Sequence, residues 1–473
     1  MSSPFFTVAV PTKNRPDRVG NAVRSVLEQT FEDFEVIVCD NSDEAESEAT
    51  AAIVDELGDP RIRYVRTSGR LSMPDNWERA IEDARGEYVG ILTDRSVFRG
   101  DAMQVVHDEI AGSGAPLVTW FNDLYGKGAS GREFKRRACT LKRYRHSSET
   151  ILDYFLHGNP KYSTKVIPKL MTSFCSRATL DEIRGGPVGR CCPPVAPDFT
   201  SGFLMLAHCE WVLTLDECLY VSCGAGNGSD FRRGGDLADR FRRDLGMEWH
   251  EIVDRMPSDA CFSHALVLND LMRVRDAIPD RLPNVEIDRV QYYVGCLIDF
   301  VKAAQHGARR NDDLDELLAA LEQEPPEIRH RVQQTRLFAT AATPDGVRAR
   351  LEAKASGEPA APAPEFDTVF EAMAWDAANP REPAATSLVE LGFGLDQLLD
   401  KSRGQPPRAK KLPRSPKTAG SRADAAEIAE AQAAKARARA AKRAAKRAAK
   451  RPARGRPARV RDRLRGLLAR ARA

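Results

Sequence analysis

The sequence lacks several patterns that would assign it to a simple class. No apolar run approaches the roughly 18 residues of a transmembrane helix, so we predict no membrane span. The first residues show no basic region followed by an apolar stretch, so we predict no signal peptide and expect a cytoplasmic location. The 10 cysteines have irregular spacing and no CxxC pair, which argues against a disulfide framework or a zinc site.

The net charge is also small, at +3, because two regions of opposite sign nearly cancel. Residues 401–473 hold 25 Lys and Arg against 4 Asp and Glu, whereas residues 1–400 hold 46 against 64. The chain is therefore an acidic body followed by a strongly basic tail. Its hydrophobic content of 42% is enough for a substantial core.

Short apolar runs alternate with amphipathic helical patterns in the first 100 residues. We predict strands at 5–10, 34–39, 62–65 and 88–92, with helices between them, and a further strand at 117–121. This alternation predicts an α/β, Rossmann-like domain with a mostly parallel sheet. Such sheets bind ligands at the carboxyl ends of their strands.

Composition divides the chain into four predicted regions. We expect the α/β domain over 1–235 and a helical accessory region over 236–355. A linker with a short helix near 386–399 is expected over 356–403, and a Lys/Ala/Arg-rich basic tail over 404–473.

The tail ends in a segment with apolar residues on one helical face among arginines, namely Val460, Leu464, Leu467 and Leu468. This pattern predicts a short amphipathic helix, and residues 424–473 together suit an anionic membrane surface, such as the inner face of the plasma membrane. Binding to nucleic acid is an alternative, because Lys and Arg repeats neutralise phosphates, and a solvated tail is another. The acidic body and the lack of aromatic residues in the tail argue against nucleic acid.

Three polar segments follow predicted strands: Pro11–Arg15, Cys39–Ser42 and Thr93–Ser96. Because the carboxyl ends of parallel strands meet at one edge of a sheet, these segments are expected to converge on one site. Asp40 can accept hydrogen bonds from a base or a ribose. Asp94 can ligate a divalent cation that bridges a diphosphate.

In order and spacing, these segments resemble family 2 glycosyltransferases of the GT-A fold. The matching stretches are Thr7–Arg15, Ala22–Phe31, Asp33–Ser42, Leu71–Glu78 and Ala84–Val89. The resemblance is strong over residues 5–100 and weak from there to about 235. It implies inverting transfer of a sugar from a nucleotide-diphosphate sugar, typically UDP-linked, to an acceptor hydroxyl of a cell-surface glycan, on a lipid-linked or polymeric acceptor.

The resemblance also implies roles for individual residues. Pro11 and Thr12 would line the nucleotide pocket, Asp40 would bind the base, and Asp94 would remain from the family's acidic metal motif, which holds Mn²⁺ or Mg²⁺. The full set of expected donor-binding residues is Pro11, Thr12, Arg15, Asp40, Asn76, Asp94 and Arg95.

The acidic motif departs from the family pattern, because Asp94 is followed by Arg95 where relatives carry further Asp residues. Three hypotheses follow. A metal binds through Asp94 and the donor phosphates, Arg95 replaces the metal as a diphosphate clamp, or donor chemistry is lost and a binding module is left. Under the last hypothesis the protein is non-catalytic. A nucleic-acid-associated protein acting through its tail is a further alternative.

An inverting transferase also needs a general base for the acceptor hydroxyl, and Asp198 is the candidate. The alternative role for Asp198 is that of an ordinary helix N-cap residue. Asp216 and Asp230 are second choices. The glycine-rich segment 224–229 is expected to form a mobile loop at the acceptor side, and Trp77 is expected in the core.

Overall fold

The computed structural model describes residues 3–127, 131–158, 160, 163–224, 236–305, 311–335, 337–338 and 364–386. These residues belong to one unit that extends to Lys410. A second unit, Lys411–Ala473, lies outside the described residues, and so does the whole predicted tail over 404–473. The short helix expected near 386–399 likewise lies outside them, except for residue 386.

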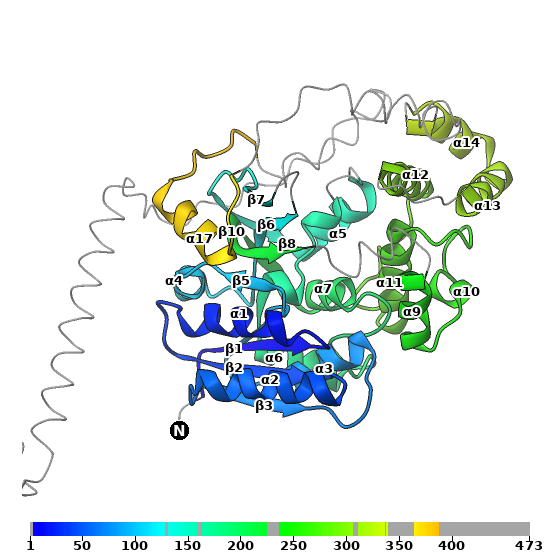
Figure 1. Cartoon of the computed structure of the whole chain (residues 1–473). Coiled ribbons are helices and arrows are strands. Elements are labelled where there is room, and N and C mark those ends of the chain that lie inside the picture. The colour runs from blue at the N-terminus through cyan, green and yellow to red at the C-terminus, as the bar shows by residue number, and fades with distance from the viewer. Residues whose placement is uncertain are drawn as a thin grey trace, which may run out of the picture. The chain divides into compact units, whose positions relative to one another are not determined.

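One mixed sheet forms the centre of the described part of the chain (Figure 1). Its main path has the order β3-β2-β1-β4-β9-β6-β10-β5, while β7 pairs with β6 and β8 pairs with β10. The strands are β1 (Phe6–Thr12), β2 (Phe34–Asp40), β3 (Ile62–Arg66), β4 (Tyr88–Ile91), β5 (Ser96–Phe98), β6 (Leu117–Lys127), β7 (Arg132–Lys135), β8 (Arg143–Ser147), β9 (Ser173–Ser176) and β10 (Trp211–Cys223).

The predicted parallel half is confirmed, because β3, β2, β1 and β4 pair in parallel at the predicted positions. Every residue of β1 and β2 is buried, as expected for central strands covered on both faces. The other half differs in direction, since β9 runs antiparallel to β4 and β6. Of that half, only the strand near 117–121 was predicted.

Helices cover both faces of the sheet (Figure 1). One face packs against α1 (Pro16–Leu27), α2 (Glu44–Leu57) and α4 (Ala102–Ser113). The other face packs against α3 (Met73–Glu82), α5 (Ser148–His157), α6 (Arg177–Gly185) and α7 (Pro197–His208). Two short 3₁₀ turns, η1 (Ser163–Lys165) and η2 (Leu170–Thr172), connect α5 to β9.

Local sequence signals set the ends of the helices near the site. Pro16 opens α1, where its missing N–H costs nothing. The Ser72 hydroxyl caps α3 by accepting from the Asp75 amide. Gly58 ends α2 with φ 57°, a left-handed conformation that glycine adopts without steric penalty.

The predicted helical region is confirmed for its described part. It comprises α9 (Asp236–Leu245), α10 (Trp249–Ile252), α11 (Ser263–Ala277), α12 (Arg289–Gln305), α13 (Asn311–Gln323) and α14 (Pro326–Gln333). These helices gather on the right of Figure 1. Buried residues of α11 and α12 share one hydrophobic cluster with those of α7, so the apolar core continues from the sheet into the helical region.

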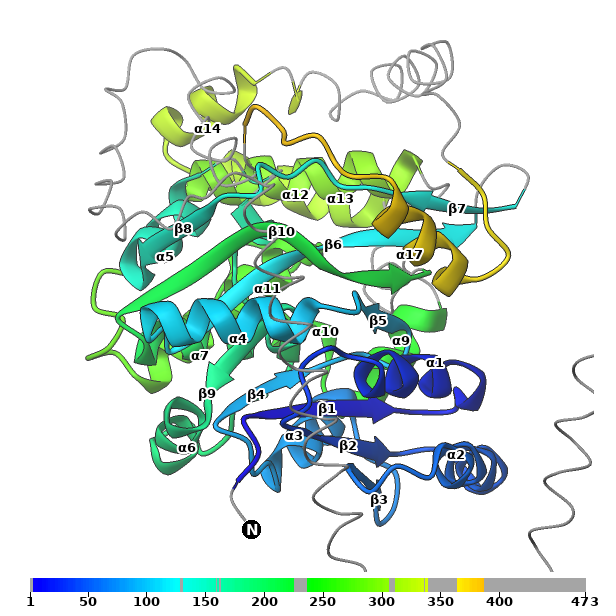
Figure 2. The same cartoon turned by 90° about the vertical axis from the view of Figure 1, so that its left-hand side faces the viewer.

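The segment 364–386 belongs to the predicted linker with a short helix near 386–399, and it contains a helix at an earlier position, α17 (Val369–Ala378). A capping box begins this helix, in which Thr368 and Glu371 exchange hydrogen bonds. Figures 1 and 2 both place α17 beside β10, and its residue Val369 packs with Val97 and Val221. Residues 364–386 thus cover the sheet.

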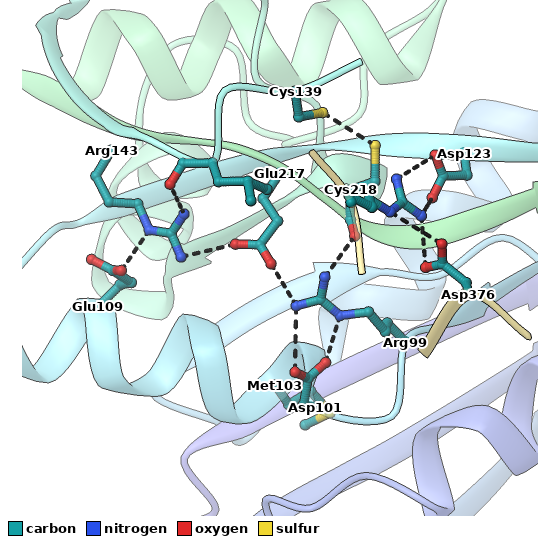
Figure 3. A network of polar contacts seen from close by, with 12 residues as sticks. Arg99, Asp101, Met103, Glu109, Asp123, Cys139, Arg143, Glu217, Cys218 and Asp376 are labelled. Carbon is teal, nitrogen blue, oxygen red and sulfur yellow. Dashed lines mark hydrogen bonds and ion pairs between the residues drawn. The ribbon is translucent and has the colours of Figure 1, made fainter. Parts of the chain in front are cut away.

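A network of ion pairs, here called the Glu217 network, joins β10 to α4 and β8 (Figure 3). The Glu217 carboxylate accepts from Arg99 at 2.7 Å and from Arg143 at 2.9 Å. Arg99 also pairs with Asp101, and Arg143 with Glu109, both at 2.6 Å. Each of these two partly exposed guanidinium groups therefore has two carboxylate partners.

Among the described residues, no helix combines the length and the apolar character needed to cross a bilayer.

Candidate active site

The carboxyl ends of β1, β2 and β4 meet at one edge of the sheet, as the sequence predicted. Thr12 lies opposite Asp40 in the β1–β2 register, and Pro11 precedes it within β1. The Leu92 amide at the end of β4 donates to the Ala9 carbonyl at 2.9 Å. The loops that carry the predicted donor-binding residues therefore start side by side.

Asp40 is fully buried at the end of β2. One carboxylate oxygen accepts from the Tyr64 hydroxyl at 2.8 Å, and the other from the Ser42 amide at 3.0 Å. A carboxylate oxygen can accept more than one hydrogen bond, so these contacts orient the group and leave capacity for a ligand N–H.

Asp94 links the first and fourth strand ends directly. Its carboxylate accepts from the Thr12 hydroxyl at 3.0 Å and from Nη1 of Arg15 at 3.1 and 3.4 Å. The Asp94 side chain is 4% exposed and that of Arg15 is 33% exposed, so the pair opens toward solvent on the arginine side. Both had been predicted as donor-binding residues, but their ion pair had not been predicted.

Arg95 follows Asp94 in the tight turn between β4 and β5. The Ser96 amide donates to the Thr93 carbonyl at 2.9 Å and the Cys223 amide to the Arg95 carbonyl at 2.8 Å, which fixes the turn. Nη1 of Arg95 is buried without a hydrogen-bond partner in the described part of the chain. Burial lowers the pKa of Arg95, and the charge of Arg15 lowers it further.

Asn76 lies in the first half of α3, buried against the first loop. Its amide nitrogen donates to the Thr12 carbonyl at 3.3 Å, while its side-chain oxygen is buried with no partner among the described residues. An unsatisfied buried acceptor is uncommon, and it points to a missing donor at this place. The neighbouring Trp77 is in the core, as predicted.

The candidate base Asp198 lies in the first turn of α7 and does not cap it, since the N-cap residue is Ala196. Its carboxylate accepts from Nζ of Lys169 at 3.2 Å and is 26% exposed. Burial chiefly raises the pKa of Tyr220, the charges of Arg137 and Arg95 oppose this rise, and the charge of Asp198 adds to it.

The second choices for the base differ from Asp198. Asp216 is fully buried: Oδ2 accepts from both the amide and the hydroxyl of Thr140, while Oδ1 has no hydrogen-bond partner among the described residues. Asp230 and most of the glycine-rich segment 224–229 lie outside the described residues.

Asp270, which the sequence analysis did not single out, holds the chain just before Asp198. Its carboxylate, fully buried in α11, accepts from the amides of Val195 at 3.0 Å and Ala196 at 2.9 Å. Burial raises the pKa of Asp270 to about 7, although these two amides act in the opposite direction. The helical region thus anchors the turn that presents Asp198.

The residues around Asp94 fit a divalent cation poorly. In the described part of the chain, no group of three or more His, Cys, Asp or Glu side chains could hold a metal ion. The Asp94 carboxylate already neutralises Arg15, and Arg95 brings a second positive charge beside it.

Comparison with known proteins relates the first part of the chain to glycosyltransferases. Residues 7–159 match the model of glycosyl transferase family 2. The chain is 35% identical over 106 residues to the GalNAc(5)-diNAcBac-PP-undecaprenol beta-1,3-glucosyltransferase of Campylobacter jejuni, covering 22% of this chain and 33% of that protein. It is 26% identical over 115 residues to the succinoglycan biosynthesis protein ExoO of Rhizobium meliloti, covering 24% and 32%. The chain thus spans about a third of the length of these relatives.

A search of solved structures finds TarS of S. aureus, residues 1–349, in complex with UDP. The identity is 15%, the TM-score is 0.38, and the match covers 78% of this chain and 94% of that one.

Proposed function

We propose that this protein, a member of glycosyltransferase family 2 through residues 7–159, transfers a sugar from a nucleotide-diphosphate sugar to an acceptor hydroxyl. The observation that carries the proposal is the meeting of the β1, β2 and β4 loops around Asp94, which links Thr12 to Arg15 at the carboxyl edge of the parallel strands. Ligands bind at this edge in open α/β sheets.

The donor would lie across these loops. Asp40, already oriented by Tyr64, would accept from the base, for which uracil is expected. Pro11 and Thr12 would line the nucleotide pocket, and the unpaired side-chain oxygen of Asn76 would accept from a donor hydroxyl. We propose a UDP-linked hexose as the donor.

The acceptor hydroxyl would be activated by Asp198. The base removes the proton while the acceptor oxygen attacks the anomeric carbon from the side opposite the diphosphate, and the configuration inverts. Nζ of Lys169 donates to the Asp198 carboxylate at 3.2 Å and holds it in place at the start of α7. We propose a cell-surface glycan as the product, built on a lipid-linked or polymeric acceptor.

We further propose that the protein works at the cytoplasmic face of the plasma membrane. The support is the basic composition of residues 424–473, which favours an anionic lipid surface over a neutral one. Nucleic acid is a less favoured partner, because the tail holds no aromatic residue.

The direct test compares Asp198→Asn with Asp153→Asn, a matched change of an exposed aspartate in α5. UDP release from a panel of UDP-hexoses is measured with a cell-envelope extract as acceptor source, and UDP affinity is measured by calorimetry. We expect Asp198→Asn to lose roughly 10²- to 10⁴-fold in turnover, as general-base removal does. UDP affinity should stay within about twofold, because the base serves the acceptor.

Two results would count against this assignment. Unchanged turnover in Asp198→Asn would remove the proposed base. Wild-type protein that binds UDP but releases none from any donor would favour the alternative of a non-catalytic binding module.

A further inference from the structure

Three guanidinium groups gather beside the turn between β4 and β5. Arg15 is the N-cap residue of α1, Arg18 lies in the first turn of the same helix, and Arg95 lies in the turn itself. Burial chiefly lowers the pKa of Arg95, the charges of Arg15 and Arg18 lower it as well, and the charge of Asp94 acts in the opposite direction. We call these three arginines the donor-side arginines.

Within the residues that the structure describes, Asp94 and Asp17 are the carboxylates that form ion pairs with Arg15 and Arg18. Arg15 pairs with Asp94 at 3.1 Å, and Arg18 approaches Asp17 at 3.7 Å, but the Asp17 side chain is 75% exposed and its attraction is screened by water. Nη1 of Arg95 donates to no atom of the described residues, although it is buried. A buried cationic donor without an acceptor is costly, so its presence points to an anion that is bound in function.

The position of the cluster identifies the anion. The donor-side arginines lie at the strand edge that holds the predicted nucleotide pocket, next to Thr12 and Asp94. Two of them begin α1, and the N-terminus of a helix adds partial positive charge. Guanidinium groups match phosphate oxygens in a two-pronged geometry.

We infer that Arg95, supported by Arg15 and Arg18, binds the diphosphate of the donor directly, without a bridging divalent cation. The inference rests on the proposed function and specifies its donor site. The bond from the anomeric carbon to the diphosphate oxygen breaks, and its electron pair stays on that oxygen. The acceptor oxygen forms the new bond and its proton passes to Asp198. The guanidinium groups stabilise the charge that develops on the leaving nucleoside diphosphate.

The test measures binding of UDP, GDP and uridine to the full chain by calorimetry, once with EDTA and once with Mn²⁺. Arg95→Met removes the positive charge. Arg95→Lys keeps the charge but lacks the paired N–H donors of a guanidinium group. The matched control is Arg24→Met, an exposed arginine later in α1. Uridine has no phosphate, so its binding reports on the base pocket alone.

We expect wild-type protein to bind UDP with equal affinity in EDTA and Mn²⁺. Arg95→Met should weaken UDP binding about 10- to 100-fold, the usual effect of losing a hydrogen bond to a charged group. Arg95→Lys should fall in between. Uridine binding and the Arg24→Met variant should be unchanged.

Three results would overturn the inference. If UDP binds only with Mn²⁺ and Arg95→Met binds it as wild type does, a metal holds the diphosphate and the transferase proposal stands. If Arg95→Met does not fold, a requirement for Mn²⁺ in wild-type protein alone is enough to reject the clamp. If wild-type protein binds no nucleotide under either condition, the proposed function fails with it.

Discussion

Arg95 and Arg99 are four residues apart in the chain and both are partly buried, yet their surroundings are opposite. Arg99 donates to two carboxylates, those of Asp101 and Glu217 (Figure 3). Burial alone would lower the pKa of Arg99, but the two carboxylates raise it above its usual value. The pKa of Arg95 is lowered by burial and by Arg15. The difference teaches that burial does not define an arginine's role, whereas the charge it faces does.

In the Glu217 network, both arginines pair with carboxylates of the described residues. Among the donor-side arginines, Nη1 of Arg95 has no hydrogen-bond partner in that part of the chain. Burial alone would raise the pKa of Glu217, but the charges of Arg99 and Arg143 lower it. Structural ion pairs of this kind hold elements together. The donor-side arginines share one buried carboxylate, that of Asp94, so a bound anion would reduce the repulsion among them.

The largest expected effect comes from breaking the complete network. Glu217→Gln leaves Arg99 and Arg143 each short of one charged partner, and losing a hydrogen bond to a charged group costs about 1.5–3 kcal/mol. Urea denaturation against the exposed control Glu48→Gln measures the loss. A loss no greater than that of the control would show that the network does not stabilise the fold.

Asp270 sharpens the comparison, because its close partners are backbone amides and not arginines. Asp198 on α7 raises its pKa and Arg273 on α11 lowers it, and burial sets the value of about 7. The pKa in the folded protein lies above the unfolded value of roughly 4, so this group contributes stability below pH 4 that is lost as the pH rises through 7.

The check is the free energy of unfolding of wild type relative to Asp270→Asn at several pH values. We expect the difference to move against wild type by about 1 kcal/mol per unit between pH 5 and 7. A difference that does not change with pH would mean that Asp270 stays ionised throughout this range.

The smallest expected effect has the opposite sign to the first. Arg95→Met removes a charge that its neighbours repel, so stability without nucleotide should be unchanged or rise by up to about 1 kcal/mol. The same change at Arg99 should destabilise the protein. Thermal melts of both variants decide the comparison, and equal losses would place Arg95 among the structural arginines.

Sequence patterns predicted the parallel strands and the three loops at their ends. Strand positions follow from apolar runs, and the meeting of the loops follows from parallel pairing. The mixed half of the sheet was mostly missed, and its strands β7, β8 and β9 have four or five residues each and carry little periodicity. Helix α17 was missed although its capping box, Thr368 to Glu371, was present in the sequence.

The roles of Arg95 and Arg99 could not have been separated from sequence. Both are arginines beside a short apolar strand, and neither has a local signal that names its partner. The carboxylate that engages Arg99 comes from Glu217, 118 positions along the chain. Asp270 likewise acts on a turn 74 and 75 positions away, through contacts that only the packing of α11 on α7 creates.

The placement of α17 matters for anyone who shortens this protein. A cut before 364, at the composition change that looks like a natural boundary, would uncover the apolar side chains of Tyr125, Phe134 and Val221. It would also leave the buried carboxylate of Asp123 without the guanidinium of Arg381. A truncated protein for crystallisation or expression should therefore end after 386, so that the sheet keeps the segment that shields it.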